Sequence, residues 1–397
     1  MILLLFVGID VAKHKHDIAI LDDSGVILKS HLRIKNNRGG FKLLNQTLEK
    51  LYHSLAEEIF IAMEDTGIYS LNLFQFLRSK RYIVHTYNPL LIKEFAKSTS
   101  LRKTKTDKRD ALTIAYKCYL DRMDSPPKVD PVIEELKRLT RHRSRIGQYQ
   151  SDLKIQYTRV IDLVFPELAS LLNPVNLHLK YVHAMLSVYP STTQLANAHL
   201  TSLTTLLKKA SKGRVGKSRA IQIRDLARES IGTVSDSLSF ELIHLIKTIR
   251  FYRHMIQETD QQIESIMAEI QSPILTIPGI SFRLGSVILS EIRSIEQFQN
   301  PGQLLAFSGL EPSIYQSGEY SGQGKMVKRG SPSLRWAILQ AARLIAIQSP
   351  VFKTYFIKKR EEGKHYNVAL SHVAKKLVRV MFYLLKSEQS FDESKLV

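Results

Sequence analysis

The chain has very little cysteine and no long apolar segment. It carries one cysteine, Cys118, among 397 residues, which excludes an intramolecular disulfide and a cysteine-rich zinc site. A reducing, cytoplasmic location fits this composition. The apolar start, Met1 to Ile9, lacks a basic flank, and Asp10 follows it at once. A signal peptide or membrane span is therefore not expected, and a buried strand is.

Acidic residues are scarce in relation to basic ones. Asp and Glu number 37 against 57 Lys and Arg, and the formal net charge is +20. The excess is +6 over residues 1–125, +6 over 126–270 and +8 over 271–397. Such a charge favours polyanionic partners, although a basic protein that its charge merely keeps in solution is the alternative. We expect DNA or RNA to contact each part of the chain, and we expect no membrane partner.

Three domains are expected, with the same boundaries: 1–125, 126–270 and 271–397. In the first, strand patterns fall at residues 3–9, 16–21, 25–34, 59–63 and 82–86, and helical patterns at 41–55, 69–78 and 89–98. Strands followed by strand–helix alternation predict an α/β domain with a mixed sheet. The second domain is expected to be helical with a basic insertion, and the third to be mostly helical.

Two seams of apolar residues mark the middle of the chain. The first consists of Val132, Leu136, Leu139, Arg143, Ile146, Gln150, Leu153, Tyr157, Val160 and Val164. The second consists of Leu238, Leu242, Leu245, Ile249, Tyr252, Ile256, Thr259, Ile263, Ile266 and Ile270. Steps of four and three that alternate over such a length favour a coiled coil over a plain helical bundle. The two helices would pair antiparallel in one chain, or across two chains.

Basic residues gather between the seams, in a less regular segment at about 166–236. From Lys208 to Arg228 eight basic residues stand against Asp225 alone. This stretch is interpreted as a phosphate-contacting tip or loop, and a solvated charged surface is the alternative. The residues expected to bind nucleic acid there are Lys208, Lys209, Lys212, Arg214, Lys217 and Arg219.

The last domain opens with the pattern Ile277-Pro278-Gly279-Ile280, followed by a helix at about 283–292. The pattern resembles a helix-hairpin-helix motif, in which backbone N–H groups at the turn with Gly279 would meet a phosphate. A plain connection between helices is the alternative. Further helices are expected at 304–310 and 332–347, and residues 386–397 are expected to be a frayed end.

Four carboxylates stand at places that can converge. Asp10 ends the first strand, Glu64 ends the strand expected beside it, and Asp107 and Asp110 share one face of a helix. Such a cluster needs a divalent cation, and hard oxygen ligands select Mg²⁺, with Mn²⁺ as a substitute. A pair of metals can clamp the attacking and leaving oxygens of a phosphoryl transfer. Lys105, Lys108 and Arg109 would hold nucleic acid beside the acids.

The neighbours of these acids leave two choices open. Asp65 follows Glu64, and strand alternation lets only one of them face the site; we choose Glu64, although spacing alone does not decide it. His14 and His16 share the parity of Asp10 and can be read as metal ligands. We favour the reading in which they flank a solvent-facing hairpin turn, because Lys13 and Lys15 interleave with them.

A loop rich in Gly and Ser, residues 311–325, is the second candidate site. Ser317 precedes a glycine there, and the nearby Lys325, Lys328 and Arg329 would bind phosphate and stabilise the charge of a phosphorane. A serine needs a base or metal for activation, and the loop contains no histidine. Rival nucleophiles are Ser313, Ser321, Tyr315 and Tyr320. On chemistry alone we favour a phosphate-binding loop without a covalent role.

The motifs together are similar to those of a known family. They are Gly8-Ile9-Asp10-Val11-Ala12-Lys13, Met63-Glu64-Asp65-Thr66-Gly67-Ile68-Tyr69, Lys105-Thr106-Asp107-Lys108-Arg109-Asp110-Ala111, Ile277-Pro278-Gly279-Ile280, Leu310-Glu311-Pro312-Ser313-Ile314-Tyr315-Gln316-Ser317-Gly318 and Lys328-Arg329-Gly330-Ser331-Pro332-Ser333-Leu334-Arg335. In this order they resemble the insertion-sequence 110 family of DEDD transposases. The middle of the chain matches only in its helical character.

The resemblance implies a RuvC-like, ribonuclease-H-related fold for the first domain. Asp10, Glu64, Asp107 and Asp110 match the D-E-D-D set of the family. Ser317 matches its catalytic serine, which attacks a DNA phosphate and forms a transient covalent link, and this reverses our reading of the loop. The resemblance also implies a structured bridge RNA that pairs with donor and target DNA. Dimers or tetramers would bring the acids of one protomer to the serine of another.

The sequence therefore predicts an RNA-guided DNA recombinase of a mobile element. A metal-dependent junction nuclease, in which water attacks and Ser317 only binds phosphate, is one alternative. A non-catalytic nucleic-acid-binding protein, in which the acids are structural, is the other. All three hypotheses share the basic surface, so the acids and Ser317 discriminate among them.

Overall fold

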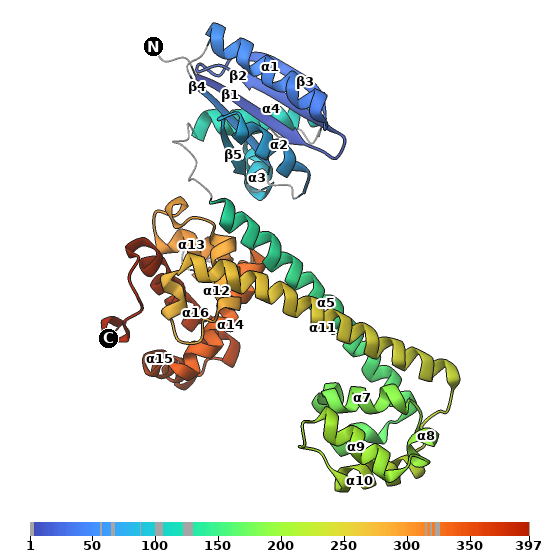
Figure 1. Ribbon diagram of the computed structural model, residues 1–397. Helices are drawn as coiled ribbons and strands as arrows, with labels where there is room; N and C mark the ends of the chain where they lie inside the picture. The colour runs from blue at the N-terminus through green and yellow to red at the C-terminus, as the bar shows by residue number, and fades with distance from the viewer. Residues whose placement is uncertain are drawn as a thin grey trace. The chain divides into compact units, whose positions relative to one another are not determined.

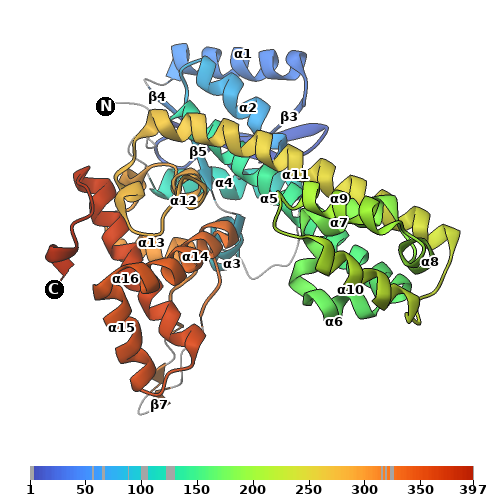
Figure 2. The same ribbon diagram turned by 60° about the horizontal axis from the view of Figure 1, so that its bottom comes forward.

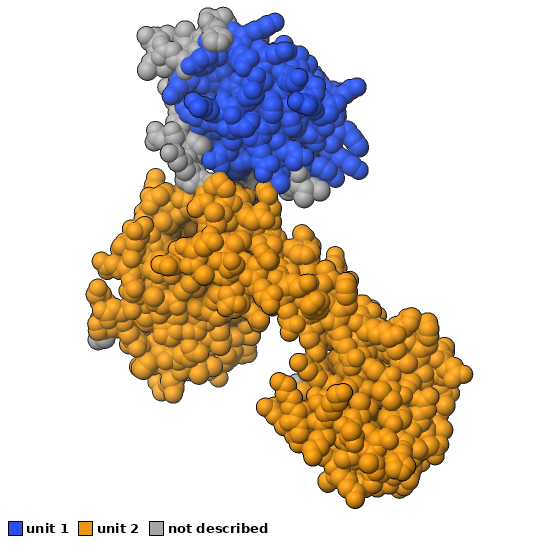
Figure 3. Space-filling model, viewed as in Figure 1, with its two compact units in different colours: residues 1–128 blue, residues 129–397 orange. Residues whose placement is uncertain are grey.

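The computed structural model describes residues 4–55, 58–64, 68–87, 89–99, 106–121, 130–313, 316–317, 320–321 and 326–396. The chain divides into two compact units, residues 1–128 and 129–397, coloured separately in Figure 3. The second boundary that the sequence predicts, near residue 270, lies inside the second unit, and the division into three domains stays a prediction. Among the described residues, no helix is long and apolar enough to cross a membrane.

The first unit is built on a five-stranded mixed sheet, as the sequence predicts (Figure 1). Its elements are β1 (Leu4–Val11), β2 (Lys15–Leu21), β3 (Ile27–Lys35), α1 (Arg38–Leu55), β4 (Glu58–Glu64), α2 (Ile68–Ser79), β5 (Ile83–Tyr87), α3 (Pro89–Thr99) and α4 (Asp107–Asp121). The strand order is β3-β2-β1-β4-β5. β1, β2 and β3 pair antiparallel in sequence, whereas β1, β4 and β5 run parallel.

Strand alternation divides the core of this unit between the two faces of the sheet. On one face, Leu5, Val7 and Ile9 of β1 pack with apolar residues of α1 and α2. On the other face, Phe6 and residues of α3 and α4 form a second cluster, which also buries Cys118. The side chain at position 10 follows the parity of Phe6, so it belongs to the α4 face.

Contact between α4 and β1 depends on Gly8. A Cβ atom at this position would lie 2.2 Å from the backbone nitrogen of Ala115 and 2.3 Å from the carbonyl oxygen of Ala111. Nearer the start of β1, the ring of Phe6 meets that of Tyr119 with centroids 5.4 Å apart. The helix therefore runs antiparallel to β1, and its amino-terminal end lies toward Asp10.

The second unit contains two long helices, α5 (Pro131–Val164) and α11 (Asp236–Ile270), which lie side by side in Figures 1 and 2. Arg143 Nε lies 2.8 Å from Asp260 Oδ1, and Gln150 donates to the carbonyl oxygen of Ile249 at 3.2 Å. These contacts show an antiparallel pair within one chain. Of the two pairings that the sequence leaves open, this is the one the structure contains, whereas coiled-coil packing stays a prediction.

The segment between the long helices is more regular than expected. It contains α6 (Glu167–Leu172), the 3-10 turn η1 (Pro174–His178), α7 (Lys180–Val188), α8 (Thr192–Ala196), α9 (Leu200–Ala210) and α10 (Lys217–Arg228). These helices share a core with one end of the α5–α11 pair. The basic stretch is accordingly a helical hairpin, α9–turn–α10, in place of the loop considered from the sequence.

The remaining part of the second unit is also helical. It contains η2 (Pro273–Thr276), α12 (Phe282–Ile292), η3 (Ile295–Gln297), α13 (Pro301–Ser308), the short strands β6 (Gln316–Ser317) and β7 (Tyr320–Ser321), α14 (Pro332–Gln348), α15 (Pro350–Glu361), α16 (Tyr366–Ser387) and η4 (Glu393–Leu396). Its core includes Leu136 of α5 and Ile263 of α11. The other end of the helix pair is thus built into this part.

The expectation of a frayed end at residues 386–397 is wrong for the described residues. The backbone N–H of Phe391 donates to Thr276 Oγ1 at 2.7 Å, and Lys386 pairs with Glu296. Glu393 accepts from the backbone N–H of Val351 at 3.1 Å and from Ser349, the N-cap of α15. A carboxylate at a helix amino terminus is favourable because it meets unpaired N–H groups and the positive end of the helix dipole.

The contact at Gly8 yields a prediction about stability. We expect Gly8→Ala to lower the free energy of unfolding of the first unit by about 3 kcal/mol, because β1 or α4 must shift to admit the methyl group. Hydrogen exchange of β1 and α4 peptides measures this. Gly39→Ala in α1 is the matched control, since its nearest neighbour is Asn37 Oδ1 at 3.5 Å. Equal protection in the two variants would contradict the prediction.

Candidate active site

Two of the four predicted carboxylates lie on neighbouring parallel strands. Ile9 of β1 is in register with Met63 of β4, so Asp10 and Glu64 follow at the same edge of the sheet. Glu64 has the parity of Phe60 and Ala62, which belong to the core on the α4 face. Asp65, the rival of Glu64, lies outside the described residues.

The other two carboxylates occupy the first turn of α4. The Thr106 carbonyl oxygen accepts from the backbone N–H groups of Arg109 and Asp110, at 2.8 and 2.9 Å, and Thr106 Oγ1 accepts from Arg109 at 3.3 Å. This turn fixes the amino terminus of the helix, where acidic side chains are stabilised by the helix dipole. Because α4 runs antiparallel to β1, its first turn lies toward Asp10.

The pKa of Asp10 shows that these groups share one electrostatic environment. Burial raises this pKa from 3.8 to about 6, and repulsion from Asp110, Glu64, Asp107 and Asp17 adds to the rise. A carboxyl group among other carboxylates resists ionisation because each added negative charge repels the rest. A bound cation would relieve this repulsion.

Asp17 is a fifth carboxylate that the sequence analysis missed. It is the cross-strand partner of Asp10 in the β1–β2 register, and its side chain is 1% exposed. Burial alone would raise its pKa, but hydrogen bonds from His31 and Arg33 and the nearby charges lower it. The signal was available: a tight hairpin between the two strands opposes residues 10 and 17, so both face the same side.

The two histidines of the hairpin are separated by the structure. His14 is exposed in the turn, as expected. His16 is fully buried in β2, where its ring lies 6.0 Å from that of Phe41, and burial lowers its pKa. His16 flanks the exposed turn as expected, because it pairs with Val11, but its own side chain does not face solvent. It alternates with Asp17, so it faces α1 on the side of the sheet away from the acids.

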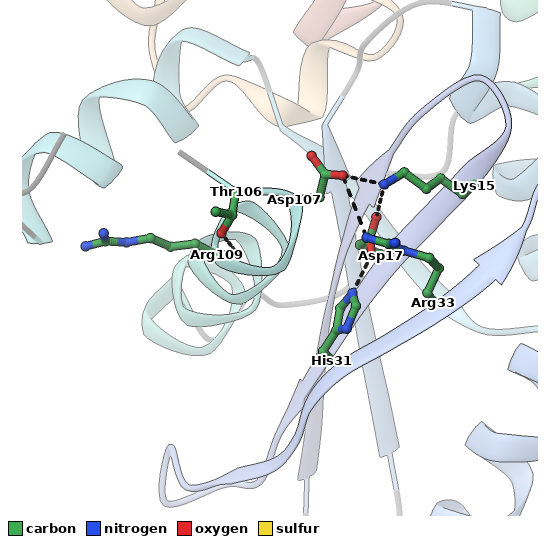
Figure 4. A network of polar contacts seen from close by, with 7 residues as sticks. All are labelled: Lys15, Asp17, His31, Arg33, Thr106, Asp107 and Arg109. Carbon is green, nitrogen blue, oxygen red and sulfur yellow. Dashed lines mark hydrogen bonds and ion pairs between the residues drawn. The ribbon is translucent and has the colours of Figure 1, made fainter. Parts of the chain in front are cut away.

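Basic side chains of β2 and β3 contact two of the acids, Asp17 and Asp107 (Figure 4). Lys15 Nζ lies 2.6 Å from Asp107 Oδ2 and 3.7 Å from Asp17 Oδ2. Arg33 Nε lies 2.8 Å from Asp17 Oδ1, and Arg33 Nη2 lies 3.9 Å from Asp107 Oδ2. His31 Nε2 also hydrogen-bonds Asp17. Lys15 therefore bridges Asp17 of β2 and Asp107 of α4.

The chemistry of these side chains fits a hard divalent cation, which prefers oxygen ligands. The acids around Asp10 supply carboxylate oxygens, and their negative charges repel one another. Within the described ranges, no three His, Cys, Asp or Glu side chains stand close enough together to hold a metal ion. Asp107 is directed toward Lys15 (Figure 4).

The residues expected to bind nucleic acid differ in how far they are exposed. Lys105 and Lys325 lie outside the described residues. Exposed members are Lys108, Lys208, Lys209, Lys212, Arg214, Lys217, Lys328 and Arg329, whereas Arg109 and Arg219 are half-buried. Gly279 has a left-handed φ of +86°, and a Cβ there would lie 2.6 Å from Leu344 Cβ of α14. Close packing on α14 gives this glycine a structural role, and phosphate binding at its turn stays a prediction.

The structure describes the two ends of the serine loop, which are held together by backbone contacts. Pro312 and Met326 form an antiparallel bridge, and the backbone N–H of Val327 donates to the Glu311 carbonyl oxygen at 2.9 Å. Arg335 of α14 donates to the carbonyl oxygens of Ser308 and Lys328 at 3.3 and 3.2 Å. Ser317 pairs through its backbone with Tyr320, but its side chain lies outside the described part of the chain.

Two family profiles match the chain. One, a DEDD transposase profile of the IS110 type described as a transposase, matches residues 7–166. The other, described as the transposase IS116/IS110/IS902 family, matches residues 271–356. Together they cover more than half of the chain, and they contain the four predicted acids and Ser317.

Curated relatives match over nearly the whole length. The IS117 mini-circle protein of Streptomyces coelicolor is 24% identical over 99% of this chain and 96% of its own. The insertion element IS116 44.8 kDa protein of Streptomyces clavuligerus is 23% identical over 98% and 96%. The pilin gene-inverting protein of Moraxella bovis is 22% identical over 98% of each chain.

The raised pKa of Asp10 gives a pH-dependent prediction. A carboxyl whose folded pKa exceeds its unfolded value of about 3.9 destabilises the fold as pH rises, with the full penalty above pH 6. In EDTA, we expect Asp10→Asn to raise the free energy of unfolding of the first unit by about 1–2 kcal/mol at pH 8, allowing for partial exposure. At pH 4 the gain should vanish.

Hydrogen exchange of β1 and β4 peptides at the two pH values measures this gain. Asp23→Asn, in the turn between β2 and β3, removes the same charge outside the acid cluster and serves as the control. A gain that is equal at pH 4 and pH 8, or equal in both variants, would refute the electrostatic explanation.

Proposed function

Because the chain belongs to the IS110 family of transposases, we propose that it exchanges DNA strands with Mg²⁺ through a transient phosphoserine link. The observation that carries the proposal is the convergence of charge at Asp10, whose pKa is raised by burial and further by Asp110, Glu64 and Asp107. A buried acid with a purely structural role usually pairs with a basic side chain. Asp10 is instead repelled by other acids in a chain with an excess of basic residues, which suits a site that binds a metal and a phosphate.

The four acids Asp10, Glu64, Asp107 and Asp110 would hold Mg²⁺, or Mn²⁺ in its place. The metal would supply charge stabilisation to the attacking and leaving oxygens of a phosphodiester. The four carboxylates would fix the position of the metal, since two are held by strand ends and two by one helix turn. Lys108 and Arg109, in the same turn as Asp107, would hold the DNA backbone beside them.

Ser317 is the proposed nucleophile. Its Oγ would attack the phosphorus and form a phosphoserine ester, while the bond to a deoxyribose oxygen breaks and that oxygen takes up a proton. The hydroxyl of the incoming strand would then attack the same phosphorus and release Ser317. One ester replaces another at each step, so no hydrolysis and no external energy are needed. In the junction-nuclease alternative, water attacks the phosphorus, so the phosphodiester is hydrolysed and no ester is kept for rejoining.

Sequence choice is proposed to rest on a structured guide RNA that pairs with DNA. Protein charge would then serve the nucleic-acid backbone and not the bases, which suits an excess of basic residues spread over the whole chain. The exposed lysines of the α9–α10 hairpin are proposed as one such contact. A dimer or tetramer is proposed as the acting form, in which the serine of one protomer can serve the acids of another.

Replacement of Ser317 tests the nucleophile. We expect Ser317→Ala to abolish both the covalent protein–DNA complex and strand exchange, with a rate loss of roughly a thousandfold or more. Trapped complexes are mapped by mass spectrometry after incubation with element DNA, its flanking RNA and Mg²⁺. Ser313→Ala and Ser321→Ala, in the same loop, should keep the complex. A Ser317→Ala protein that cleaves DNA at the full rate would support the nuclease instead.

Neutralisation of the hairpin tests its contact with phosphate. We expect the double variant Lys208→Gln, Lys209→Gln to reduce the slope of log affinity against log salt by about 2, since each phosphate contact contributes roughly 0.9. Binding to duplex DNA and to the flanking RNA is measured separately over a salt series. The variant Lys42→Gln, Lys80→Gln has the same change in net charge. Equal slopes for both variants on both ligands would contradict the contact.

A further inference from the structure

We propose that Lys15 is an internal counter-cation that occupies Asp107 until a divalent metal displaces it. The inference rests on the proposed function, because it assumes that Asp107 is a metal ligand. The inference adds to the four acids a basic residue, Lys15, which begins β2.

The geometry at Asp107 is the first support. Lys15 Nζ lies 2.6 Å from Asp107 Oδ2, which is a charge-assisted hydrogen bond and not a distant pairing. The two residues are 92 positions apart in the chain. Their meeting is therefore a product of the fold, since β2 and the first turn of α4 must both be in place. In Figure 4 the Asp107 carboxylate points toward the Lys15 ammonium.

The second support is the uneven distribution of cations over the acids. Asp17 receives Arg33, His31 and Lys15. Asp10 has four other acids in its electrostatic surroundings. Lys15 contacts both Asp17, which has other basic partners, and Asp107, which belongs to the acids around Asp10. A metal that neutralises Asp10 has to compete with this ammonium for Asp107.

Asp17 determines what happens to Lys15 after displacement. Its carboxylate lies 3.7 Å from Lys15 Nζ, on the strand next to β1. When Asp107 turns to the metal, the ammonium keeps this buried anion as a partner and stays beside the site. Lys15 would thus exchange one carboxylate for another without leaving for solvent. The side chains of Lys15 and Asp107 are 36% and 50% exposed, so the exchange needs no opening of the core.

The effect on metal affinity should be moderate. The ion pair is partly exposed, so its strength is that of a surface pair. Arg33 Nη2 is already 3.9 Å from Asp107 and remains after Lys15 is removed. We expect Lys15→Gln to lower the Kd for Mn²⁺ by about two- to fivefold. Lys15→Arg keeps the charge and should bind Mn²⁺ as the wild type does.

Mn²⁺ binding to the full-length protein, without nucleic acid, measures this by electron paramagnetic resonance of the free ion. Lys13→Gln removes the same charge from an exposed position two residues away and should leave the Kd unchanged. In an Asp107→Asn background, Lys15→Gln should have no effect, because the contested ligand is gone. Circular dichroism confirms folding for each variant.

The outcomes separate this inference from the proposed function. Wild-type protein that binds no Mn²⁺ would remove the metal site itself. Wild-type binding with the same Kd in Lys15→Gln, or an equal gain in Lys13→Gln, would overturn the role of Lys15 alone. Retention of the gain in the Asp107→Asn background would show a general field effect and would also overturn it.

Discussion

The close approach of α4 to β1 at Gly8 is the constraint on which the candidate site depends. The helix backbone lies where any larger side chain would stand. This contact places the first turn of α4 at the edge of the sheet where β1 and β4 end. Two acids from strands and two from a helix can then share one environment, although they are separated by up to a hundred residues in the chain. Without it, Asp107 and Asp110 would be ordinary acids at a helix start, where the helix dipole favours them anyway.

Charge balance distinguishes this site from the other buried acids of the chain. Asp260 meets Arg143 and Arg283, each at 2.8 Å. Glu291, 3% exposed, meets Arg141 at 3.0 Å and accepts from Ser331, and its pKa is lowered. In both cases a buried charge has partners, which is what its burial requires. At Asp10, burial and then repulsion from other acids raise the pKa, and this imbalance supports the proposal that the site binds a cation.

Much of the first unit could be predicted from the sequence. Alternating apolar strands, the acids at their ends and the shared helix face of Asp107 and Asp110 each depend on local pattern, and the mixed sheet follows from the order of elements. What the sequence analysis missed depends on pairing across strands. Asp17 and His16 acquire their roles from the hairpin register, which places one against Asp10 and the other against Phe41. The contact of Lys15 with Asp107 joins residues too distant for any local pattern to predict.

The second unit shows the same limit in another form. Heptad seams predicted the long helices but left their pairing open, because antiparallel and intermolecular pairs bury the same apolar stripe. Partly buried polar contacts between them, such as that of Arg143 with Asp260, favour one register. A similar device anchors the serine loop: Glu291 accepts from Ser331, the N-cap of α14, while Arg335 of the same helix donates to carbonyl oxygens on both sides of the loop's base. The proposed role of Ser317 as a nucleophile would require the ends of its loop to be held in this way, since small displacements of a reacting atom are costly in rate. The first turn of α4 is thus positioned by backbone contact in the first unit, and the two ends of the serine loop are held by hydrogen bonds from α14 in the second.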